Sequence, residues 1–511
     1  AGGAITITDG VSGTTGGGNL RYDAQGGDLT FATLTAGAPG NLSLHATASI
    51  LGTANGLLTG NGVRLEAGNG VGSQVLFSAN QVKLEAATLA ALAGAGGISV
   101  SDLSALSIGA VGPVSVSRVG MDGGPTSVTD ALLSGLATSA NGNIFSFSAA
   151  GSLTVDQAVA ADGSGVAVLR ANGAASDLVL NASVNSATGD VVLGADRDLV
   201  ITGVTAGTGG GGAIQASANR SILMNGAALF STISGDMILS AGSEFQVGEV
   251  FSTSGNVIAF ASGAPGFTDA NAAGLNFRAA SLQLNATSGP LGSGVNPIET
   301  ETGLLAANAG GAIFLRNTGA LTIGDTPFAG FTSQSASGFP AAFAVGGSSD
   351  LTAGGSVVLV NSGGIIVEDG TVNNPGVGVR SATGNILLQD LSGLITLRAD
   401  FSAPAGGITV LAAGNLAVET SLAGVGSTVD LQALGGDLTF LSGLALNSLG
   451  SNVRLQASGD VVLANVNAGA GNVHVQAGDD ILMAGGGHTI TANQARFVAT
   501  DAVGDLPGNA P

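Results

Sequence analysis

The sequence predicts an all-β fold, a right-handed parallel β-helix (β-solenoid) whose coils each take about 22–23 residues. Three observations predict it: a glycine-led phrase that recurs along the chain, a spacing near 23 residues between its copies, and a composition rich in both Gly and aliphatic residues. We expect residues 1–511 to form one continuous solenoid with side-loop insertions.

The composition excludes a disordered polar chain. Of the 511 residues 87 are Gly, yet 45% are hydrophobic and the mean hydropathy is +0.47. A disordered tract would not carry this much Val, Leu and Ile. Glycine therefore punctuates apolar strands. A solenoid also avoids the size limit of a single core, because each coil buries its face on the next.

The recurring phrase is Gly, then usually Asp, Asn, Ala or Ser, then alternating apolar residues. It reads GDLTF at 27–31 and again at 436–440, with further copies at 40–44, 189–193, 235–239, 384–388, 459–463 and 471–475. Gly189, Gly212 and Gly235 are 23 residues apart in sequence. Three strands of about 4–6 residues with three short turns need about 20–24 residues, which closes one three-sided coil. Alternation then places Leu, Val, Ile and Phe inward, and Thr, Ser and Asn outward.

Gly followed by Asp or Asn suits the corner of a coil. Both residues tolerate positive φ, and the side chain can satisfy nearby amides. Stacked corner aspartates could also share a divalent cation such as calcium. The Gly-Gly-x-Gly-x-Asp nonapeptide of calcium-binding β-rolls is absent, and many corners use Asn, Ala or Ser. Calcium stays a hypothesis, and no other cofactor is predicted. The candidate ligands are Asp28, Asp190, Asp236, Asp437 and Asp460.

Charge and residue usage exclude several classes of protein. The net charge is −21, from 34 acidic and 13 basic residues, and this balance argues against nucleic-acid binding. There is no Cys, so neither a disulfide framework nor a thiolate metal site can form. No run of about 18 apolar residues occurs, so we expect no membrane span. The chain opens in a strand-like run at 5–7, and any signal peptide is expected upstream or removed.

Three stretches break the regular pattern and predict loop excursions, at 109–143, 261–274 and 325–349. The first includes a predicted short helix around 130–138. The last is rich in Pro, Gly and Ser and carries Phe328, Phe331, Phe339 and Phe343. Loops at coil corners project sideways and often carry function. These phenylalanines either contact a subunit or partner, or fold back over a groove of the solenoid.

Two acidic clusters are candidate catalytic groups. Asp479 and Asp480 with His488 resemble the paired carboxylates and His of polygalacturonases, but they sit at a Gly-Asp corner and no Arg-x-Lys follows. Asp196-Arg197-Asp198 is better explained by an ion pair at a coil edge. The three His are far apart in sequence, and Trp is absent although sugar clefts usually stack aromatic rings on the substrate. We therefore predict no enzymatic activity.

Residues 311–324, which read GAIFLRNTGALTIG, resemble the repeat regions of large filamentous-haemagglutinin-like bacterial exoproteins. The resemblance extends over most of the chain and is compositional. It implies a secreted adhesin or matrix component. The Asn-Pro-Asn motifs of that family's secretion domain are not matched, since 296–297 and 374–375 lack the third residue. A sequence echo between 282–297 and 496–511 further suggests that both termini were cut from a longer repeat protein.

The predicted function is a structural or adhesive segment of a secreted bacterial surface or matrix protein. About 20–23 coils at about 4.8 Å per coil would give a stiff rod about 100 Å long. One alternative is the subunit of an extracellular filament or sheath assembled end to end. Another is a β-helical polysaccharide lyase or hydrolase. The expected partners are copies of the chain or a host or matrix surface, outside the cell.

Overall fold

The computed structural model describes residues 2–72, 81–327, 331–334, 340–343, 347–372, 376–423, 428–448, 450–485 and 487–504. Within these residues the protein is all-β without a helix, and its parallel strands stack as a β-solenoid of about 20 turns. The predicted fold class is confirmed. In the described part of the chain, no helical segment has the length and hydropathy that a membrane crossing requires.

Contacts divide the chain into two compact units. Unit 1 consists of Ala1–Gly242, Gln246–Gly255 and Gly330–Ala344; unit 2 consists of Ser243–Phe245, Asn256–Ala329 and Val345–Pro511. Each unit is described by itself below. The continuity of one solenoid over 1–511 stays a prediction.

Unit 1 holds the first part of the strand series. In chain order its strands are β1 (Ile5–Thr6), β2 (Ser12–Thr15), β3 (Leu20–Ala24), β4 (Leu29–Ala36), β5 (Leu42–Ala46), β6 (Ile50–Ala67), β7 (Gly70–Val71), β8 (Val82–Ala93), β9 (Gly97–Asp102), β10 (Leu106–Ile108), β11 (Ala110–Val111), β12 (Val114–Val119), β13 (Pro125–Asp130), β14 (Leu133–Ser134), β15 (Leu136–Thr138), β16 (Ile144–Ser148), β17 (Leu153–Val155), β18 (Val159–Ala161), β19 (Ala167–Ala171), β20 (Leu178–Leu180), β21 (Val184–Ser186), β22 (Val191–Ala195), β23 (Asp198–Ile201), β24 (Thr205–Thr208), β25 (Ile214–Ala218), β26 (Ser221–Met224), β27 (Leu229–Thr232), β28 (Met237–Ala241), β30 (Glu249–Ser252), β37 (Phe331–Gln334) and β38 (Pro340–Phe343). β29 (Phe245–Val247) has its first residue in unit 2 and the others in unit 1.

Unit 2 holds the remaining strands. They are β31 (Asn256–Ala261), β32 (Phe267–Asp269), β33 (Phe277–Ala286), β34 (Ile298–Ala309), β35 (Ile313–Thr318), β36 (Leu321–Ile323), β39 (Leu351–Ala353), β40 (Val357–Ser362), β41 (Ile365–Val367), β42 (Val377–Ser381), β43 (Ile386–Asp390), β44 (Ile395–Leu397), β45 (Asp400–Ser402), β46 (Ile408–Ala412), β47 (Leu416–Val418), β48 (Val429–Ala433), β49 (Leu438–Phe440), β50 (Ala445–Asn447), β51 (Val453–Ala457), β52 (Val461–Leu463), β53 (Asn465–Asn467), β54 (Asn472–Ala477), β55 (Ile481–Met483), β56 (Ile490–Thr491), β57 (Gln494–Val498) and β58 (Val503–Gly504).

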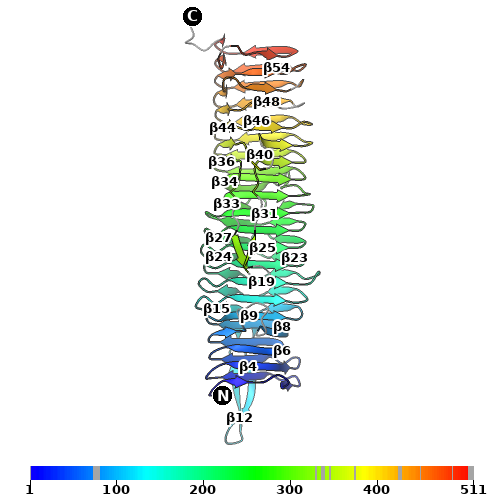
Figure 1. Cartoon of the computed structure of the whole chain (residues 1–511), viewed down its shortest axis with the longest axis vertical. Coiled ribbons are helices and arrows are strands. Elements are labelled where there is room, and N and C mark those ends of the chain that lie inside the picture. Colours follow the sequence, from blue (N-terminus) through cyan, green and yellow to red (C-terminus); the bar gives the residue numbers. More distant parts are fainter. Residues whose placement is uncertain are drawn as a thin grey trace. The chain divides into compact units, whose positions relative to one another are not determined.

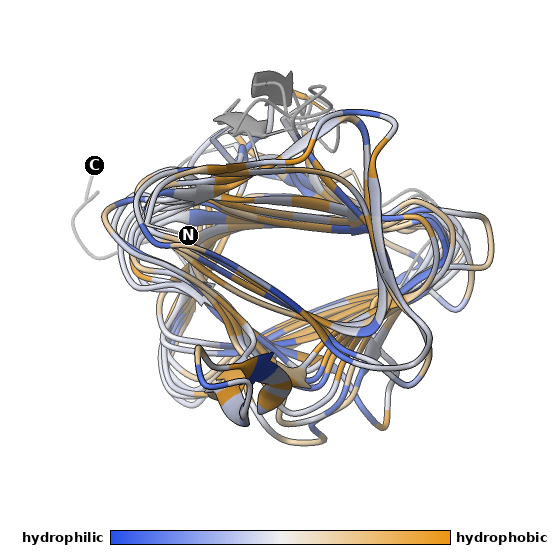
Figure 2. Ribbon diagram, turned by 90° about the horizontal axis from the view of Figure 1, so that it is seen from below, coloured by the Kyte–Doolittle hydropathy of each residue, from blue (hydrophilic) through white to orange (hydrophobic). Residues whose placement is uncertain are grey.

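One coil of unit 1 illustrates the repeat. β22, β23 and β24 form its three sides, and each pairs in parallel with the strand three places on, β25, β26 and β27. Val191 pairs with Ile214 and Ile214 with Met237, so each of these two coils takes 23 residues, as predicted. The strands of unit 1 follow one another from β4 to β25 in Figure 1. Figure 2 shows coils end-on, with strands along the sides and turns at the corners.

The core of each unit is a set of aliphatic ladders. In unit 1 Leu193, Ala216 and Leu239 stack on consecutive coils, each with no exposed surface. In unit 2 one ladder runs over six coils and no member is more than 3% exposed. Burial of about 25 cal/mol per Å² of apolar surface makes these ladders the main stabilising contribution. The residues of the unit 2 ladder are Val357, Ile386, Ile408, Val429, Val453 and Val473.

The predicted excursion at 109–143 is present, but the helix predicted around 130–138 is wrong. β12 and β13 form an antiparallel hairpin, and β11 pairs with β14 at its base. β15 belongs to the coil, because Leu136 pairs with Ala91 on one side and Val159 on the other. Gly135 has φ +70°, and an added Cβ there would lie 2.1 Å from the carbonyl oxygen of Ala158. Ladder burial and this left-handed glycine override the local helix propensity.

The other two predicted excursions differ in how far they leave the coil. In the stretch at 261–274, β32 lies within the solenoid: Phe267 is fully buried and bridges in parallel to Leu291. Its ring lies 5.3 Å from that of Phe245 and 6.4 Å from that of Phe277. The bounds predicted for this excursion therefore stay a prediction. In 325–349, β37 and β38 form an antiparallel hairpin, as an excursion requires.

Neighbouring strands offer a matched test of the inward ladders. Leu199 on β23 is fully buried, whereas Leu223 on β26 points outward and is half-buried. We expect Leu199→Ala to reduce the free energy of unfolding by about 2–5 kcal/mol because it leaves a cavity. Leu223→Ala should cost less than about 1.5 kcal/mol. Urea denaturation with hydrogen exchange at β23 and β26 measures both, and equal losses would contradict the inward assignment.

Candidate functional site

The corner aspartates bind backbone amides of the next coil. Their carboxylate oxygens accept hydrogen bonds across one turn of the solenoid in the direction of the C-terminus. Asp236 also has an interaction partner. Asp and Asn both suit this corner position, since each offers a short side-chain oxygen that accepts a hydrogen bond. The bonds are Ser49 N to Asp28 Oδ1, 2.9 Å; Ala213 N to Asp190 Oδ1, 2.8 Å; Asp460 N to Asp437 Oδ1, 2.9 Å; and Asp480 N to Asp460 Oδ1, 2.9 Å.

Asparagine performs the same role at other corners. The Oδ1 atom of Asn385 accepts the Gly407 amide at 2.8 Å, and that of Asn415 accepts the Asp437 amide at 3.0 Å. Asn carries no charge, so the corner requires an acceptor and does not require an anion. For Asp28, Asp190, Asp437 and Asp460, binding a backbone amide is a sufficient role for the side chain.

The last coils nevertheless concentrate carboxylates. Asp460, Asp479 and Asp480 each offer an oxygen, and these atoms lie within 4.8 Å of one another. Repulsion from Asp480 first, then burial and the charges of Asp460, Asp501 and Asp437, raises the pKa of Asp479. Asp460 is thus the one predicted cation candidate in such a group among the described residues. The cluster repels itself at neutral pH, and counter-ions of any kind would relieve it.

The other predicted clusters have structural roles. Arg170 pairs with Asp196 at 2.9 Å, and Arg220 pairs with Asp198 from the next coil. The hydrogen bond from Arg197 holds the pKa of Asp177 below its usual value. The arginines and aspartates thus alternate across coils, as expected for an ion pair at a coil edge.

The three histidines occupy separate environments. His45 contacts Asp23 at 2.7 Å. Burial, and then the charges of Arg496 and Arg454, lower the pKa of His474. No contact within the described part of the chain joins His488 to the aspartate pair at 479–480.

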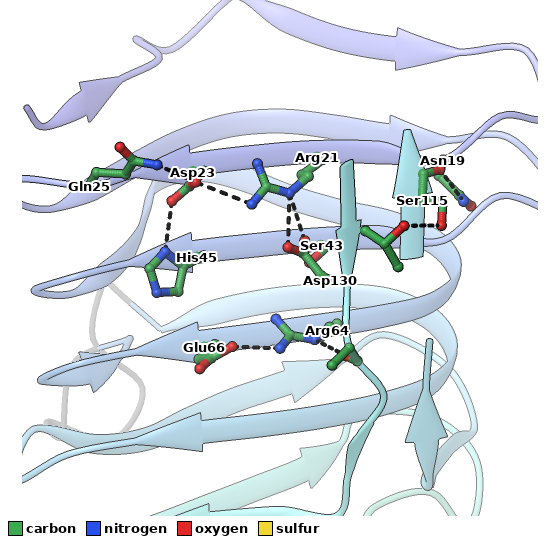
Figure 3. Close-up of polar contacts among 12 residues, drawn as sticks. Asn19, Arg21, Asp23, Gln25, Ser43, His45, Arg64, Glu66, Ser115 and Asp130 are labelled. Carbon is green, nitrogen blue, oxygen red and sulfur yellow. Dashed lines mark hydrogen bonds and ion pairs between the residues drawn. The ribbon is translucent and has the colours of Figure 1, made fainter. Parts of the chain in front are cut away.

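A polar clasp holds the β12–β13 hairpin against the outward faces of successive coils in unit 1 (Figure 3). The two oxygens of Asp130, at the end of β13, each lie 2.9 Å from Arg21 Nε on β3. Ser43 Oγ on β5 donates to the same carboxylate at 2.6 Å. Arg64 Nε on β6 donates to the Ala131 carbonyl at 2.9 Å. Sequence reasoning missed this clasp, because its partners are 67 to 109 residues apart.

Supporting contacts fix both ends of the clasp. Asn19 Nδ2 donates to the Ser115 carbonyl at 2.9 Å, and Val111 and Val114 pack on Ala90 at the hairpin base. Asp23 bonds Arg21, Gln25 and His45. Burial raises the pKa of Asp23, but hydrogen bonds from His45, Gln25 and Arg21 outweigh burial and hold it below its usual value.

The clasp borders a mainly polar groove between β3 and the hairpin. Its volume is about 530 Å³, and its walls include Tyr22, Gln25 and Arg118. The hairpin tip is exposed and apolar: Val119 is 70% exposed and Met121 fully so. In Figure 1, β12 extends past β4 on the N-terminal side. The hairpin therefore presents a surface that the coils themselves lack.

The predicted phenylalanine cluster is described only in part. Phe328 and Phe339 lie outside the described residues. Phe331 on β37 and Phe343 on β38 are direct register partners in the antiparallel hairpin. Partner contact and folding back over a groove both stay predictions for these residues.

The fold defines the protein as a β-solenoid repeat protein. No protein-family model, curated protein or solved structure gives a significant match to the chain.

Two variants of Asp460 separate its role as a hydrogen-bond acceptor from the effect of its negative charge. Asp460→Ala leaves the Asp480 amide without its acceptor and should cost about 0.5–1.5 kcal/mol. Asp460→Asn keeps the oxygen and removes one charge from the cluster, so stability should hold or rise. Because the pKa of Asp479 is raised in the fold, stability is highest below the ordinary value of 3.8 and falls as pH rises through the folded value. Asn at 460 should shrink that fall. Urea midpoints across pH measure this, and equal losses for both variants would refute the acceptor role.

The clasp is tested at Asp130. Asp130→Ala removes the partner of Arg21 and Ser43, and should weaken hairpin attachment by about 1.5–3 kcal/mol, since hydrogen bonds to charged groups carry this much. Amide exchange in β12 and β13 should accelerate about tenfold or more, with β22–β28 unchanged. Asp122→Ala at the hairpin turn is the control, because Asp122 is exposed and accepts the Gly124 amide of its own turn at 3.0 Å. Unchanged exchange in the Asp130 variant would contradict the clasp.

Proposed function

We propose that this protein is a structural or adhesive segment of a secreted bacterial surface or matrix protein, similar in kind to filamentous-haemagglutinin-like exoproteins. The observation that supports the proposal most is the stacking of parallel coils over about 20 turns. Each coil is bonded to the next through strands and corner side chains. A scaffold of this kind gives reach, stiffness and resistance to proteases.

The hairpin excursions support an adhesive component of the proposal. The β12–β13 hairpin presents an exposed apolar tip, with Val119 70% exposed, and the charged clasp holds the hairpin on the coils. Binding surfaces are commonly loops fixed on a rigid scaffold. A host or matrix surface is the partner class that we propose for it, in an extracellular setting.

End-to-end assembly is a second candidate. Phe497 on β57 and Val503 on β58 are 37% and 61% exposed, at positions that stack on the ladders of the preceding coils. They line a small apolar groove of about 160 Å³ with Leu463, Ile481 and Met483. A second copy stacked on this surface would cover it, and contacts that do not close on themselves produce filaments.

Electron microscopy of the whole chain, with calcium and again with a chelator, tests both candidates. The structural segment predicts discrete rods about 100 Å long in both conditions. Filaments with a subunit repeat of about 100 Å would favour assembly, and their loss on chelation would assign calcium to the acidic corners. Compact particles without rods would refute both.

A paired variant separates the two outcomes further. Phe497→Asp with Val503→Asp should abolish filaments and leave single rods intact, because charge at this surface opposes stacking. Ile233→Asp in the turn after β27, where Ile233 is 55% exposed, is the matched control and should leave any filaments in place. Electron micrographs of the three proteins at equal concentration provide the comparison.

A further inference from the structure

A mainly apolar groove of about 450 Å³ lies on the outer surface of unit 2. Its floor consists of outward side chains from stacked strands: Glu299 on β34, Phe314 and Arg316 on β35, and Val358 and Val360 on β40. Its walls come from two turns, at 272–273 and 293–297. Gly294 lies over the ring of Phe314, where an added Cβ would be 3.4 Å from the ring edge.

The polar end of the groove is Glu299, which is only 8% exposed. Its Oε2 atom is buried and has no hydrogen-bond partner. Oδ2 of the nearby Asp269 is buried without a partner as well. Buried carboxylate oxygens almost always have partners, so two unpartnered oxygens on acids that act on one another electrostatically require an explanation.

The surroundings of Glu299 are fixed by Asn276, which is fully buried. Asn276 accepts the amide of Glu299 at 2.9 Å and donates to Oδ1 of Asp269 at 2.7 Å. Asn276 thus holds the Glu299 backbone beside Asp269. The register pairs Glu299 with Arg316 on the next coil, but no ion pair joins their side chains in this part of the structure.

Burial, and then the charge of Asp269, raises the pKa of Glu299 to about 7, while Arg316 opposes the rise. Glu299 is thus about half ionised near neutral pH. The groups that face it are Asp269 on β32, Asn276 before β33 and Arg316 on β35. Any ligand that favours one protonation state of Glu299 therefore has a pH-dependent affinity.

The chemistry of the groove selects among ligands. A divalent cation prefers six or more oxygen ligands, and only one carboxylate lines the groove. An anion would meet the carboxylate of Glu299, the nearby charge of Asp269 and one exposed arginine, Arg316. A monovalent ammonium needs few ligands, gains from a buried carboxylate, and can lay an alkyl stem along Phe314, Val358 and Val360.

We propose that this groove binds an alkylammonium group, with its nitrogen at the carboxylate of Glu299 and its stem on the apolar floor. Either a free amine or a lysine side chain of a partner supplies this chemistry. The site goes beyond the proposed scaffold function and does not depend on whether rods assemble, because binding is measured on the dispersed chain.

Calorimetric or NMR titration of the whole chain with n-butylammonium chloride at pH 8 tests the site. Glu299→Gln should weaken binding about tenfold or more, because a charged hydrogen bond is lost. Glu301→Gln is the matched control on the same strand; Glu301 is exposed and pairs with Arg278 at 2.7 Å outside the groove. Arg316→Gln should strengthen binding, since it removes a repelling charge.

The pH dependence gives an independent measurement. Between pH 8 and pH 5.5 the affinity of wild type should fall about thirtyfold, as Glu299 becomes protonated while the amine stays charged. This dependence should vanish in Glu299→Gln. The variant removes a partly ionised buried group, so we expect it to fold at least as stably as wild type, as thermal denaturation would verify.

Several results would overturn the proposal. One is that no binding is detected at n-butylammonium concentrations up to about 50 mM. Another is an equal loss of affinity in the Glu299→Gln and Glu301→Gln variants. Stronger binding of sodium butyrate or calcium chloride than of the amine would assign the groove to a different ligand class. An Arg316→Gln variant that binds n-butylammonium more weakly than wild type would also contradict the proposal, since removing a positive charge beside the site should favour a cation. Tight binding of free lysine or a lysyl peptide would distinguish a partner side chain from a free amine.

Discussion

Every coil of this protein depends on the same demand, that backbone amides find acceptors on the adjacent coil. Backbone carbonyls satisfy it along the sides and in many turns, as where the Asn219 amide donates to the Ala195 carbonyl, but at some corners a side chain supplies the acceptor. There the short oxygen of Asp or Asn accepts the amide one coil further on, as Asn415, Asp437, Asp460 and Asp480 do in succession. The side chain extends the ladder through the turn, so the corner residue is part of the backbone hydrogen bonding.

This constraint separates chemistry that looks alike in the sequence. Asn accepts the amide as well as Asp does. Replacing one by the other therefore changes the surface charge without removing the hydrogen bond. Where several corners choose Asp, as in the last coils, the result is a self-repelling column that raises the pKa of Asp479. The repeat therefore accumulates negative charge as a by-product of hydrogen bonding. An acidic corner is weak evidence for a metal, since its carboxylate is already engaged.

The period, the alternation and the corner residues could be predicted because each is written in local sequence. The prediction of a helix around 130–138 was wrong. Leu136 pairs with Ala91 and Val159 on the adjacent coils, and local helix propensity contains no information on such distant partners. For a related reason, neither the clasp at Asp130 nor the groove at Glu299 could be predicted from the sequence. Both use outward positions, and outward positions are ordinary surface unless a distant segment covers them.

When an excursion covers outward strand positions, the polar residues there become buried, and the regular scaffold gains a site with distinct chemical properties. Where no segment covers an outward position, as at Leu223 on β26, the side chain is only half-buried. Once the β12–β13 hairpin lies across β3 and β5, Arg21 and Asp130 become a partly buried pair. Once two turns shield β34, Glu299 becomes a buried acid with a pKa of about 7. Burial, not the residue itself, creates the site, because removing water strengthens every remaining electrostatic interaction. Function in this fold should therefore be sought where an excursion crosses an outward strand.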